Sequence, residues 1–471
     1  RLDYIYMTAL VFVFSILAFF RLGNTYAPET CYLTDSQNCD IVLDFGEYID
    51  VATISVFLGN QNTRHFSISA FNEVTGSWEI INGDAIAESV FAWNTIDLYY
   101  RLRYLGIVAT DESAMLNEMV FKKTDGTIIL PLNYREYPSL FDEQNMYPEV
   151  KTYLTGTMFD EVYHGRTAYE FLHKLTTYET THPHLGKILI SFGIIAFGMN
   201  PFGWRFMSVI FGILIIPLMY LFAKKLFENS FIAAATTGLL VFDCMHYTLS
   251  RIATIDIFAA FFILLMYYFL YEYFLKDYSY RKSKVTFSDK IPPRDVLLPL
   301  ALCGISMAFG VATKWTGVYA GLGLGVLFIW HTLTHFPKGQ VLRLFGFCCV
   351  FFIFIPLVVY ALCFIPVVGY TEYTGLIDKV IKGTQYMFNY HSTLVAEHYY
   401  SSPFYEWPII WMPLLDANDA VDSVRVSAVS CMGNPAIWWT GIFCEFYVLF
   451  RWMIKKDKKA GFLFIAYLAQ Y

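Results

Sequence analysis

Several apolar segments of this chain are long enough to cross a lipid bilayer, and they constrain the fold more than any other feature. The hydrocarbon layer is about 30 Å thick, a span that an apolar helix of about 20 residues can cross. Phe202–Phe222 and Ile255–Leu275 reach that length. Only 15% of the residues are charged, against about 25% in soluble domains, and the mean hydropathy is +0.45. The sequence therefore predicts a polytopic α-helical membrane protein that contacts the lipid bilayer.

The apolar segments also predict how the chain crosses the membrane. We expect membrane helices at Tyr4–Phe20, Phe202–Phe222, Phe231–Leu249, Ile255–Leu275, Val296–Val311, Val318–Thr334, Leu344–Val368, Ile437–Ile454 and from Phe462 onward. The first is interpreted as a helix, because no small-residue cleavage site of a signal peptide follows it. Lysine and arginine clusters follow the second, fourth, sixth and eighth segments, which predicts that these ends are cytoplasmic. The last segment stops in mid-helix, so we expect the native chain to continue.

Residues 25–150, between the first two membrane helices, have a different pattern. Phe66, Ile68 and Ala70 alternate with polar neighbours, and turn signals such as Asp125-Gly126 separate such runs. Period-2 alternation with regular turns predicts an antiparallel β-sandwich, which the charge pattern assigns to the external face.

Three short motifs make this insert similar to a galactose-binding-like, discoidin-type jelly roll. They are Leu43-Asp44-Phe45-Gly46, Arg103-Tyr104-Leu105-Gly106-Ile107 and Met115-Leu116-Asn117-Glu118-Met119. Cys31 and Cys39 lie close together in a polar part of this insert, so either a disulfide or two free thiols are compatible with the sequence. The ligand of such a domain is left open.

A polar stretch, Met158–Lys187, lies in the next segment, 151–200, which we expect to be an external loop with interfacial helices. Asp160 and Glu161 are adjacent carboxylates directly before a helical pattern. One reading is a helix N-cap with a favourable dipole. The other is a general base at Asp160 that takes a proton from an acceptor hydroxyl, with Glu161 in an orienting role.

Four further residues are candidates for binding the phosphate of a lipid donor: His182, Lys187, Arg251 and Lys314. His182 and its neighbour His184 form only a weak metal signal, because no third ligand is defined. Lysine or arginine at a helix end can also be snorkelling to the surface. Arginine recognition of phosphate is bidentate and strong, which favours the phosphate reading for Arg251.

The bundle, 201–471, contains a polar and aromatic external loop at 369–435. Tyr390, His391 and Trp407 in this loop are candidates for acceptor or sugar binding. Aromatic side chains suit sugar faces, but they also form the aromatic belt at membrane interfaces.

Together these motifs resemble the protein O-mannosyltransferase family. The resemblance rests on Phe159-Asp160-Glu161, His182–Lys187, Leu249-Ser250-Arg251, Ala312-Thr313-Lys314-Trp315, and Tyr390-His391 through Trp407-Pro408, in order over about Met158 to Tyr471. It implies a GT-C membrane fold, polyprenyl-phosphate sugar donors, an acceptor-activating aspartate at Asp160 and an essential arginine at Arg251.

Two departures from the family pattern concern the acceptor. His184 stands where the family usually has a second proline, and the β insert occupies a loop that is short in typical members. The late loop is also too short for the β-trefoil of eukaryotic members. The acceptor is therefore left open between a protein serine or threonine and a glycan.

The sequence thus predicts an inverting membrane glycosyltransferase that moves a sugar, with mannose favoured, from a polyprenyl phosphate to a hydroxyl acceptor. The donor already carries an activated phosphate bond, so the chemistry requires no cofactor or metal. The net charge of −7 gives no indication of nucleic-acid binding. A lipid-linked sugar transporter and a carbohydrate sensor are the alternatives. Charge at the external helix ends, rather than through the midplane, argues against transport.

Overall fold

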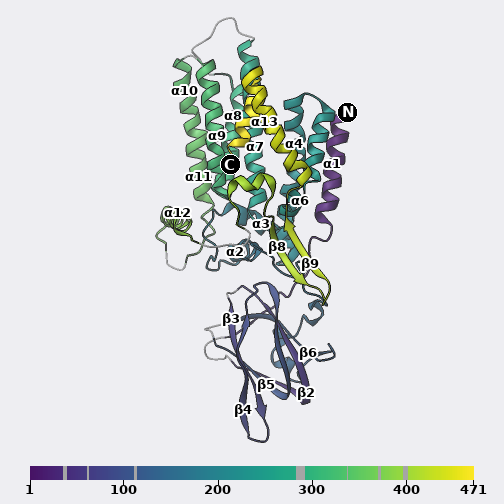
Figure 1. The fold of residues 1–471 in the computed structure, drawn as a ribbon. Helices are drawn as coiled ribbons and strands as arrows, with labels where there is room; N and C mark the ends of the chain where they lie inside the picture. The colour runs from purple at the N-terminus through teal and green to yellow at the C-terminus, as the bar shows by residue number, and fades with distance from the viewer. Residues whose placement is uncertain are drawn as a thin grey trace.

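The computed structural model consists of a helical bundle and a β domain that are joined by a thin layer of short elements (Figure 1). It describes residues 1–34, 40–60, 63–110, 114–282, 292–336, 338–369, 373–395 and 401–470. Cys39 falls outside the described residues, so the pairing with Cys31 stays a prediction.

The bundle contains six described helical stretches that are long and apolar enough to cross a membrane. They are α1 (Leu2–Phe19), α4 (Pro201–Phe227), α7 (Asp256–Lys282), α8 (Arg294–Thr313), α9 (Thr316–His335) and the stretch Gln340–Leu362. That last stretch comprises most of α10 (Lys338–Cys349), a π-helical turn (Val350–Phe354) and α11 (Ile355–Leu362). The chain is an integral membrane protein, as its hydropathy predicts.

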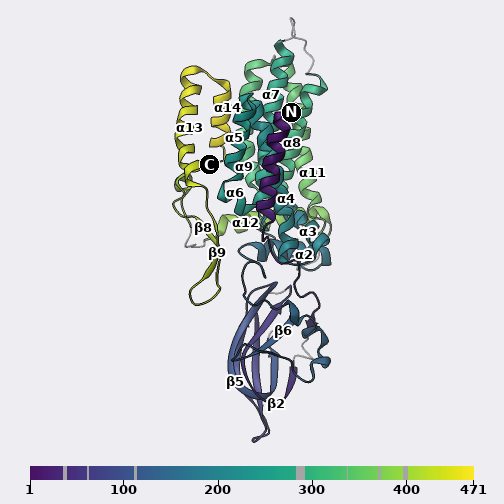
Figure 2. The same ribbon diagram turned by 90° about the vertical axis from the view of Figure 1, so that its right-hand side faces the viewer.

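The membrane helix predicted at Phe231–Leu249 is wrong, because the structure divides this segment into α5 (Ser230–Val241) and α6 (Cys244–Leu249). Asp243 lies at the break and accepts hydrogen bonds from the backbone N–H groups of Met245 (2.9 Å) and His246 (3.1 Å). An aspartate in this N-cap role starts a new helix instead of continuing the old one. Farther on, α13 (Pro435–Lys455) and α14 (Lys458–Leu468) run side by side beside the bundle (Figure 2).

The β domain is built from seven antiparallel strands around an apolar core. The strands are β1 (Tyr32–Leu33), β2 (Asp40–Leu58), β3 (Arg64–Asn72), β4 (Ser77–Ala87), β5 (Ala92–Ala109), β6 (Met115–Lys123) and β7 (Ile128–Ile129). Their order is β1-β6-β2-β5-β3-β4, and β7 pairs with β6. As predicted, Phe66, Ile68 and Ala70 are buried in the core.

The two longest strands, β2 and β5, explain why this sheet curls. Their pairing is interrupted by register shifts, one of them between Val51 and Thr53, and Tyr99 on β5 has a positive φ of 48°. Such irregularities bend a strand and increase its twist. All described strands of the β domain hydrogen-bond into one sheet, so the two separate sheets of the predicted sandwich are not seen among them. The similarity to a galactose-binding-like jelly roll stays a prediction.

The layer between bundle and β domain contains α2 (Glu161–His173) and α3 (Leu185–Phe197), which the polar stretch predicts, and several elements that were expected to be loop. Residues 369–435 include α12 (Leu376–Thr393), a 3₁₀ turn (Phe404–Ile409) and the hairpin of β8 (Leu414–Ala420) and β9 (Val426–Cys431). The strand β7 leads into this layer through 3₁₀ turns at Tyr134–Glu136, Pro138–Leu140 and Gln144–Met146.

The helix α3 is held against α4 by glycine. A Cβ atom placed on Gly193 would lie 2.3 Å from the backbone oxygen of Gly203 on α4. Only a residue without a side chain allows the two backbones to approach this closely. Because α3 follows the His182–His184 turn directly, this contact also fixes the position of the polar stretch.

We therefore expect Gly193→Ala to destabilise the protein, because the obstructing atom is backbone and cannot rotate away. Overpacking of this kind typically costs about 1–3 kcal/mol. Gly325→Ala on α9 is the matched control, since nothing lies within 4 Å of its added methyl group. Thermal unfolding of both variants in detergent tests this. Equal melting temperatures for the two variants would contradict the packing argument.

Candidate active site

Asp160 stands at the N-terminus of α2 but does not use its side chain to cap that helix. It occupies the N-cap position, yet its carboxylate makes no capping hydrogen bond within the described part of the chain. The residue before it, Phe159, has a positive φ of 47° and turns the chain sharply into the helix. The carboxylate is half-buried and lines a cavity. These observations remove the main support for the helix-cap reading.

Glu161, in contrast, is completely buried in an ion pair with Arg205 of α4. Both guanidinium–carboxylate contacts, Nε to Oε1 and Nη2 to Oε2, measure 2.7 Å. The carboxylate also accepts hydrogen bonds from the indole of Trp204 (3.2 Å) and the backbone N–H of Ala253 (3.0 Å). Glu161 is thus a positioning residue, since it joins α2 to α4 and to the turn after α6.

Arg205 has further contacts on its other side. It donates hydrogen bonds to the backbone oxygens of Leu22 (2.8 Å) and Gly156 (3.2 Å). An arginine within an apolar helix is a signal for a structural or functional partner, and this signal was present in the sequence at Phe202–Phe222. What could not be read from the sequence is that the partner is Glu161.

A second buried hub lies at Glu179, in the loop between α2 and α3. Its carboxylate forms an ion pair with Lys187 and contacts Nδ1 of His182 at 3.2 Å. Lys187 has no exposed side-chain surface, and its ammonium also donates to the backbone oxygens of Glu179 (2.9 Å) and His182 (3.0 Å). The phosphate contact predicted for Lys187 is not available in this arrangement, because the turn itself occupies the ammonium group.

Burial opposes the charge of Glu179, but Lys187 and His182 outweigh it and hold the pKa of this carboxyl well below its usual range. Burial lowers the pKa of the neighbouring His164 to about 3, so its ring is neutral. Glu179 therefore remains ionised and orients the His182 side chain that it contacts. Neither Glu179 nor His164 is among the site residues predicted from the sequence, although both lie in the polar stretch Met158–Lys187.

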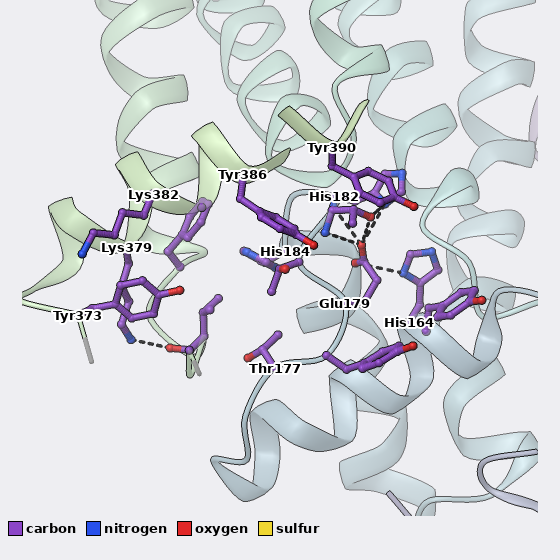
Figure 3. A pocket seen from close by; sticks show the side chains of 18 of the residues that line it. His164, Thr177, Glu179, His182, His184, Tyr373, Lys379, Lys382, Tyr386 and Tyr390 are labelled. Atoms are coloured by element: carbon purple, nitrogen blue, oxygen red, sulfur yellow. Dashed lines mark hydrogen bonds and ion pairs between the residues drawn. The ribbon is translucent and has the colours of Figure 1, made fainter. Parts of the chain in front are cut away.

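Asp160 lines a cavity of about 840 Å³ between α2, the Glu179–His184 loop and α12. Figure 3 shows His164, His182 and Tyr390 at one end of this cavity and Lys379, Lys382 and Tyr373 at the other. Its tyrosines are Tyr163, Tyr178, Tyr373, Tyr386 and Tyr390. The cavity offers a polar, aromatic-walled space beside a carboxylate, which suits a polyhydroxyl or peptide substrate.

The pKa of Asp160 is raised, first by burial and then by the nearby charge of Asp256, while Lys314 and His182 oppose the shift. A raised pKa makes this carboxylate a stronger base than an exposed aspartate. The position of the carboxylate in the cavity and its basicity are both what proton transfer from a hydroxyl requires.

A smaller cavity of about 350 Å³ shares His182 with the first one and lies beside Lys314 and His391. Lys314 forms an ion pair with Asp256 at 2.6 Å. His391 donates from Nε2 to the backbone oxygen of Thr181 at 2.8 Å, and its ring centroid lies 5.1 Å from that of His182. The structure thus brings together the predicted residues Asp160, His182, Lys314, Tyr390 and His391.

Two predicted residues lie apart from this group. Arg251 lines a separate cavity of about 220 Å³ against β9, and it donates at 2.7 Å to the backbone oxygens of both Phe20 and Arg21. Trp407 lines a third cavity beside α13. Neither residue lines the cavities of Asp160 and Lys314, so the grouping predicted for them from the sequence is not reproduced.

In the described part of the chain, one group of carboxylates is close enough together to hold a metal ion. Glu118, Asp142 and Glu143 of the β domain place ligand atoms within 4.8 Å of one another. All three accept hydrogen bonds from the chain, for example Glu118 from the Glu143 N–H at 2.6 Å and Asp142 from the Thr30 hydroxyl at 2.9 Å. These bonds explain the cluster as a structural feature of the β domain.

Glu161→Gln is expected to destabilise the protein strongly, because it leaves Arg205 buried without its counter-charge. Removing one partner of a buried ion pair typically costs about 3–5 kcal/mol. Asp378→Asn is the control, since it removes a carboxylate whose partner, Lys382, is an exposed lysine at 2.9 Å. Thermal unfolding in detergent should show a large decrease for the first variant only. A similar small decrease for both would argue against the positioning role of Glu161.

The chain is similar in sequence to known protein mannosyltransferases. The model of the family described as dolichyl-phosphate-mannose-protein mannosyltransferase matches residues 194–368. The polyprenol-phosphate-mannose–protein mannosyltransferases of Mycolicibacterium smegmatis and Mycobacterium tuberculosis are 24% and 23% identical to this chain over 365 residues. Each match covers 66% of this chain, and 70% and 69% of the respective relative.

Two solved structures also align with the chain. ArnT from Cupriavidus metallidurans aligns over 66% of this chain and 49% of its own, with a TM-score of 0.42 and 16% identity. The Saccharomyces cerevisiae Pmt1-Pmt2 complex bound to the sugar donor aligns over 44% of this chain and 30% of its own, with a TM-score of 0.38 and 20% identity. The sequence matches confirm the predicted resemblance: residues 194–368 match the dolichyl-phosphate-mannose-protein mannosyltransferase family, and the chain is similar to the mycobacterial protein mannosyltransferases over 66% of its length.

Proposed function

We propose that this protein transfers mannose from a polyprenyl-phosphate donor to a hydroxyl group of a protein acceptor, with inversion at the anomeric carbon. The observation that carries the proposal is the position of the Asp160 carboxylate, which makes no helix-capping hydrogen bond within the described part of the chain and lines a large cavity. That cavity shares His182 with the smaller cavity of Lys314. The donor and the acceptor class follow the names of the mycobacterial relatives.

Asp160 is assigned the role of general base. The acceptor hydroxyl enters the larger cavity and gives its proton to the carboxylate as its oxygen attacks the anomeric carbon. The bond from that carbon to the phosphate oxygen breaks on the opposite side, so the configuration inverts. The raised pKa of Asp160 supports this role, because a base of higher pKa takes the proton more readily.

The donor phosphate is assigned to the smaller cavity. Lys314 is a lysine that lines this cavity, and His182 lines both this cavity and the larger one. Tyr319 and Phe388, which also line this cavity, are 60% and 63% exposed and offer an apolar approach from the lipid. Fixed positive charge at the departing phosphate stabilises the transition state electrostatically. The contacts of Arg251 do not support the phosphate role that the sequence suggests for it.

The acceptor side is proposed to face the exterior of the cell. The last turns of α4 and α7 carry Lys224, Lys225, Arg281 and Lys282, whereas both helices begin near the layer that contains Asp160. Cytoplasmic ends carry the positive excess, so this distribution supports an external active site.

Asp160→Asn tests the proposal most directly. The amide is nearly isosteric and cannot take a proton, so transfer should slow by about 10²–10⁴-fold, while binding of a polyprenyl-phosphate mannose donor should be retained. Membranes with a labelled donor and an acceptor peptide provide the measurement. Transfer at the wild-type rate would exclude Asp160 as the base.

Lys314→Gln should weaken binding of the donor. A double variant that also carries Asp256→Asn removes the carboxylate that Lys314→Gln alone would leave unpaired. Because Lys314 lowers the pKa of Asp160, its loss alone should raise that pKa. Transfer falls as pH falls through this pKa, so the acid limb of the pH–rate profile should move to higher pH. Lys382→Gln, at the far end of the larger cavity, should leave the limb in place. An acid limb that stays in place in Lys314→Gln would argue against Asp160 as the general base.

The external location predicts the accessibility of single cysteines introduced into a cysteine-free chain. Ser423→Cys, in the turn of the β8–β9 hairpin, should react with a membrane-impermeant maleimide on intact cells. Ser279→Cys, near the end of α7, should react only after lysis. Both positions are exposed in the structure. The reverse labelling pattern would place the active site in the cytoplasm.

A further inference from the structure

A second polar cavity, which the proposed transfer reaction does not use, lies on the other side of the Asp160 turn. It measures about 340 Å³, within the usual size range of small-molecule sites. Its walls come from three parts of the chain: Trp93 of the β domain, the segment that ends at Phe159, and Asp416 on β8. The hairpin extends from the bundle toward the β domain (Figures 1 and 2), so this cavity lies at the seam between them.

One residue of the cavity wall, Asp416, is buried. Asp416 is only 7% exposed, and its Oδ2 atom has no hydrogen-bond partner among the described residues. A buried polar group in this state typically costs about 1–3 kcal/mol. If the Asp416 side chain rotates toward the cavity, a ligand hydroxyl that donates to Oδ2 would remove this cost. The buried oxygen is therefore an observation, independent of the cavity's size, that points to a ligand.

The other polar groups of the wall can both donate and accept hydrogen bonds. Asn418 and the hydroxyls of Thr152 and Thr155 line the cavity, together with Lys151. The ammonium of Lys151 contacts the hydroxyls of Thr95 and Ser55. Sugar hydroxyls are donors and acceptors at once, so they match a wall of this mixed kind.

The charges of the wall favour a neutral ligand. Burial, followed by the nearby Asp160 and Glu161, raises the pKa of Asp416 to about 7. Burial, followed by Lys122, lowers the pKa of Lys151 to about 8. Near neutral pH Asp416 is about half ionised and Lys151 is mostly protonated, so the two opposite charges partly offset each other and do not select an ionic ligand of either sign. The aromatic side chains of Trp93, Tyr153 and Phe159 add apolar surface of the kind that packs on sugar rings.

From this geometry we propose that the seam cavity binds one neutral saccharide unit. Its position beside Phe159, next to the residue assigned as base, suits a sugar that an acceptor already carries. The source of the sugar rests on the proposed function, whereas the binding site itself does not. The enzyme would then recognise glycosylated acceptors through this cavity and hold them next to the active carboxylate.

The site is tested by measuring the binding of methyl α-mannoside to the full chain in lipid nanodiscs, with saturation-transfer NMR as the readout. Asp416→Asn and Asn418→Ala should each weaken binding by about tenfold, the factor that corresponds to 1.4 kcal/mol and to one lost hydrogen bond to a polar or charged group. Asn418 is exposed, so its variant keeps the test valid if Asp416→Asn does not fold. Asp422→Asn, in the turn of the same hairpin, is the matched control and should bind as the wild type does.

A peptide pair identifies the source of the sugar. A mannosylated serine peptide should bind more tightly than the same peptide without mannose, and the difference should disappear in Asp416→Asn. Absence of saturable mannoside binding by the wild-type protein would overturn the proposal. Equal binding of the two peptides, or unchanged mannoside binding in both cavity variants, would overturn it as well. Mannose transfer to the unmodified peptide, measured in parallel, reports on the proposed function separately.

Discussion

The buried ion pair between Glu161 and Arg205 is the interaction on which the rest of the structure depends. It joins the start of α2, the membrane helix α4 and the turn at Ala253 in one dry contact. A pair of charges without access to water persists only when each is satisfied by the other and by further hydrogen bonds, and here both conditions hold. Because Asp160 is covalently joined to Glu161, this pair also determines where the half-buried carboxylate points.

Two adjacent carboxylates with the same chemistry thus have different environments and different roles. Glu161 is enclosed and paired, whereas Asp160 faces a cavity and has a raised pKa. The Glu179–Lys187 pair has the same enclosed character and supports His182, which borders both cavities. The site therefore consists of a few accessible polar groups held by fully buried ion pairs, so the accessible groups need little reorganisation when substrates bind.

The parts of this arrangement that are local in sequence could be predicted, and the parts that depend on distant partners could not. Hydropathy predicts the six described membrane-spanning stretches, and period-2 alternation predicts strands such as β3. The break at Asp243 was missed because the segment is mostly apolar, and a single aspartate in it does not by itself reveal a capping role. The partners of Glu161 and Lys187 depend on packing between separate elements. The helix α12 has its apolar residues at helical spacing: Leu376, Ile377, Val380 and Ile381. It was predicted to be loop because many aromatic residues follow them.

One guanidinium group contacts both ends of the β insert, and this has a consequence for how the protein could evolve. Arg205 donates to Leu22, just before the insert, and to Gly156, just after it, while the Asn24 N–H donates to Leu154 at 2.9 Å. Entry and exit are thus fastened together at the membrane surface. Insertions are tolerated where the two ends lie close together. An insert whose two ends are fastened together in this way can change in length at its far end, at the β3–β4 turn for example, with little effect on the position of the bundle.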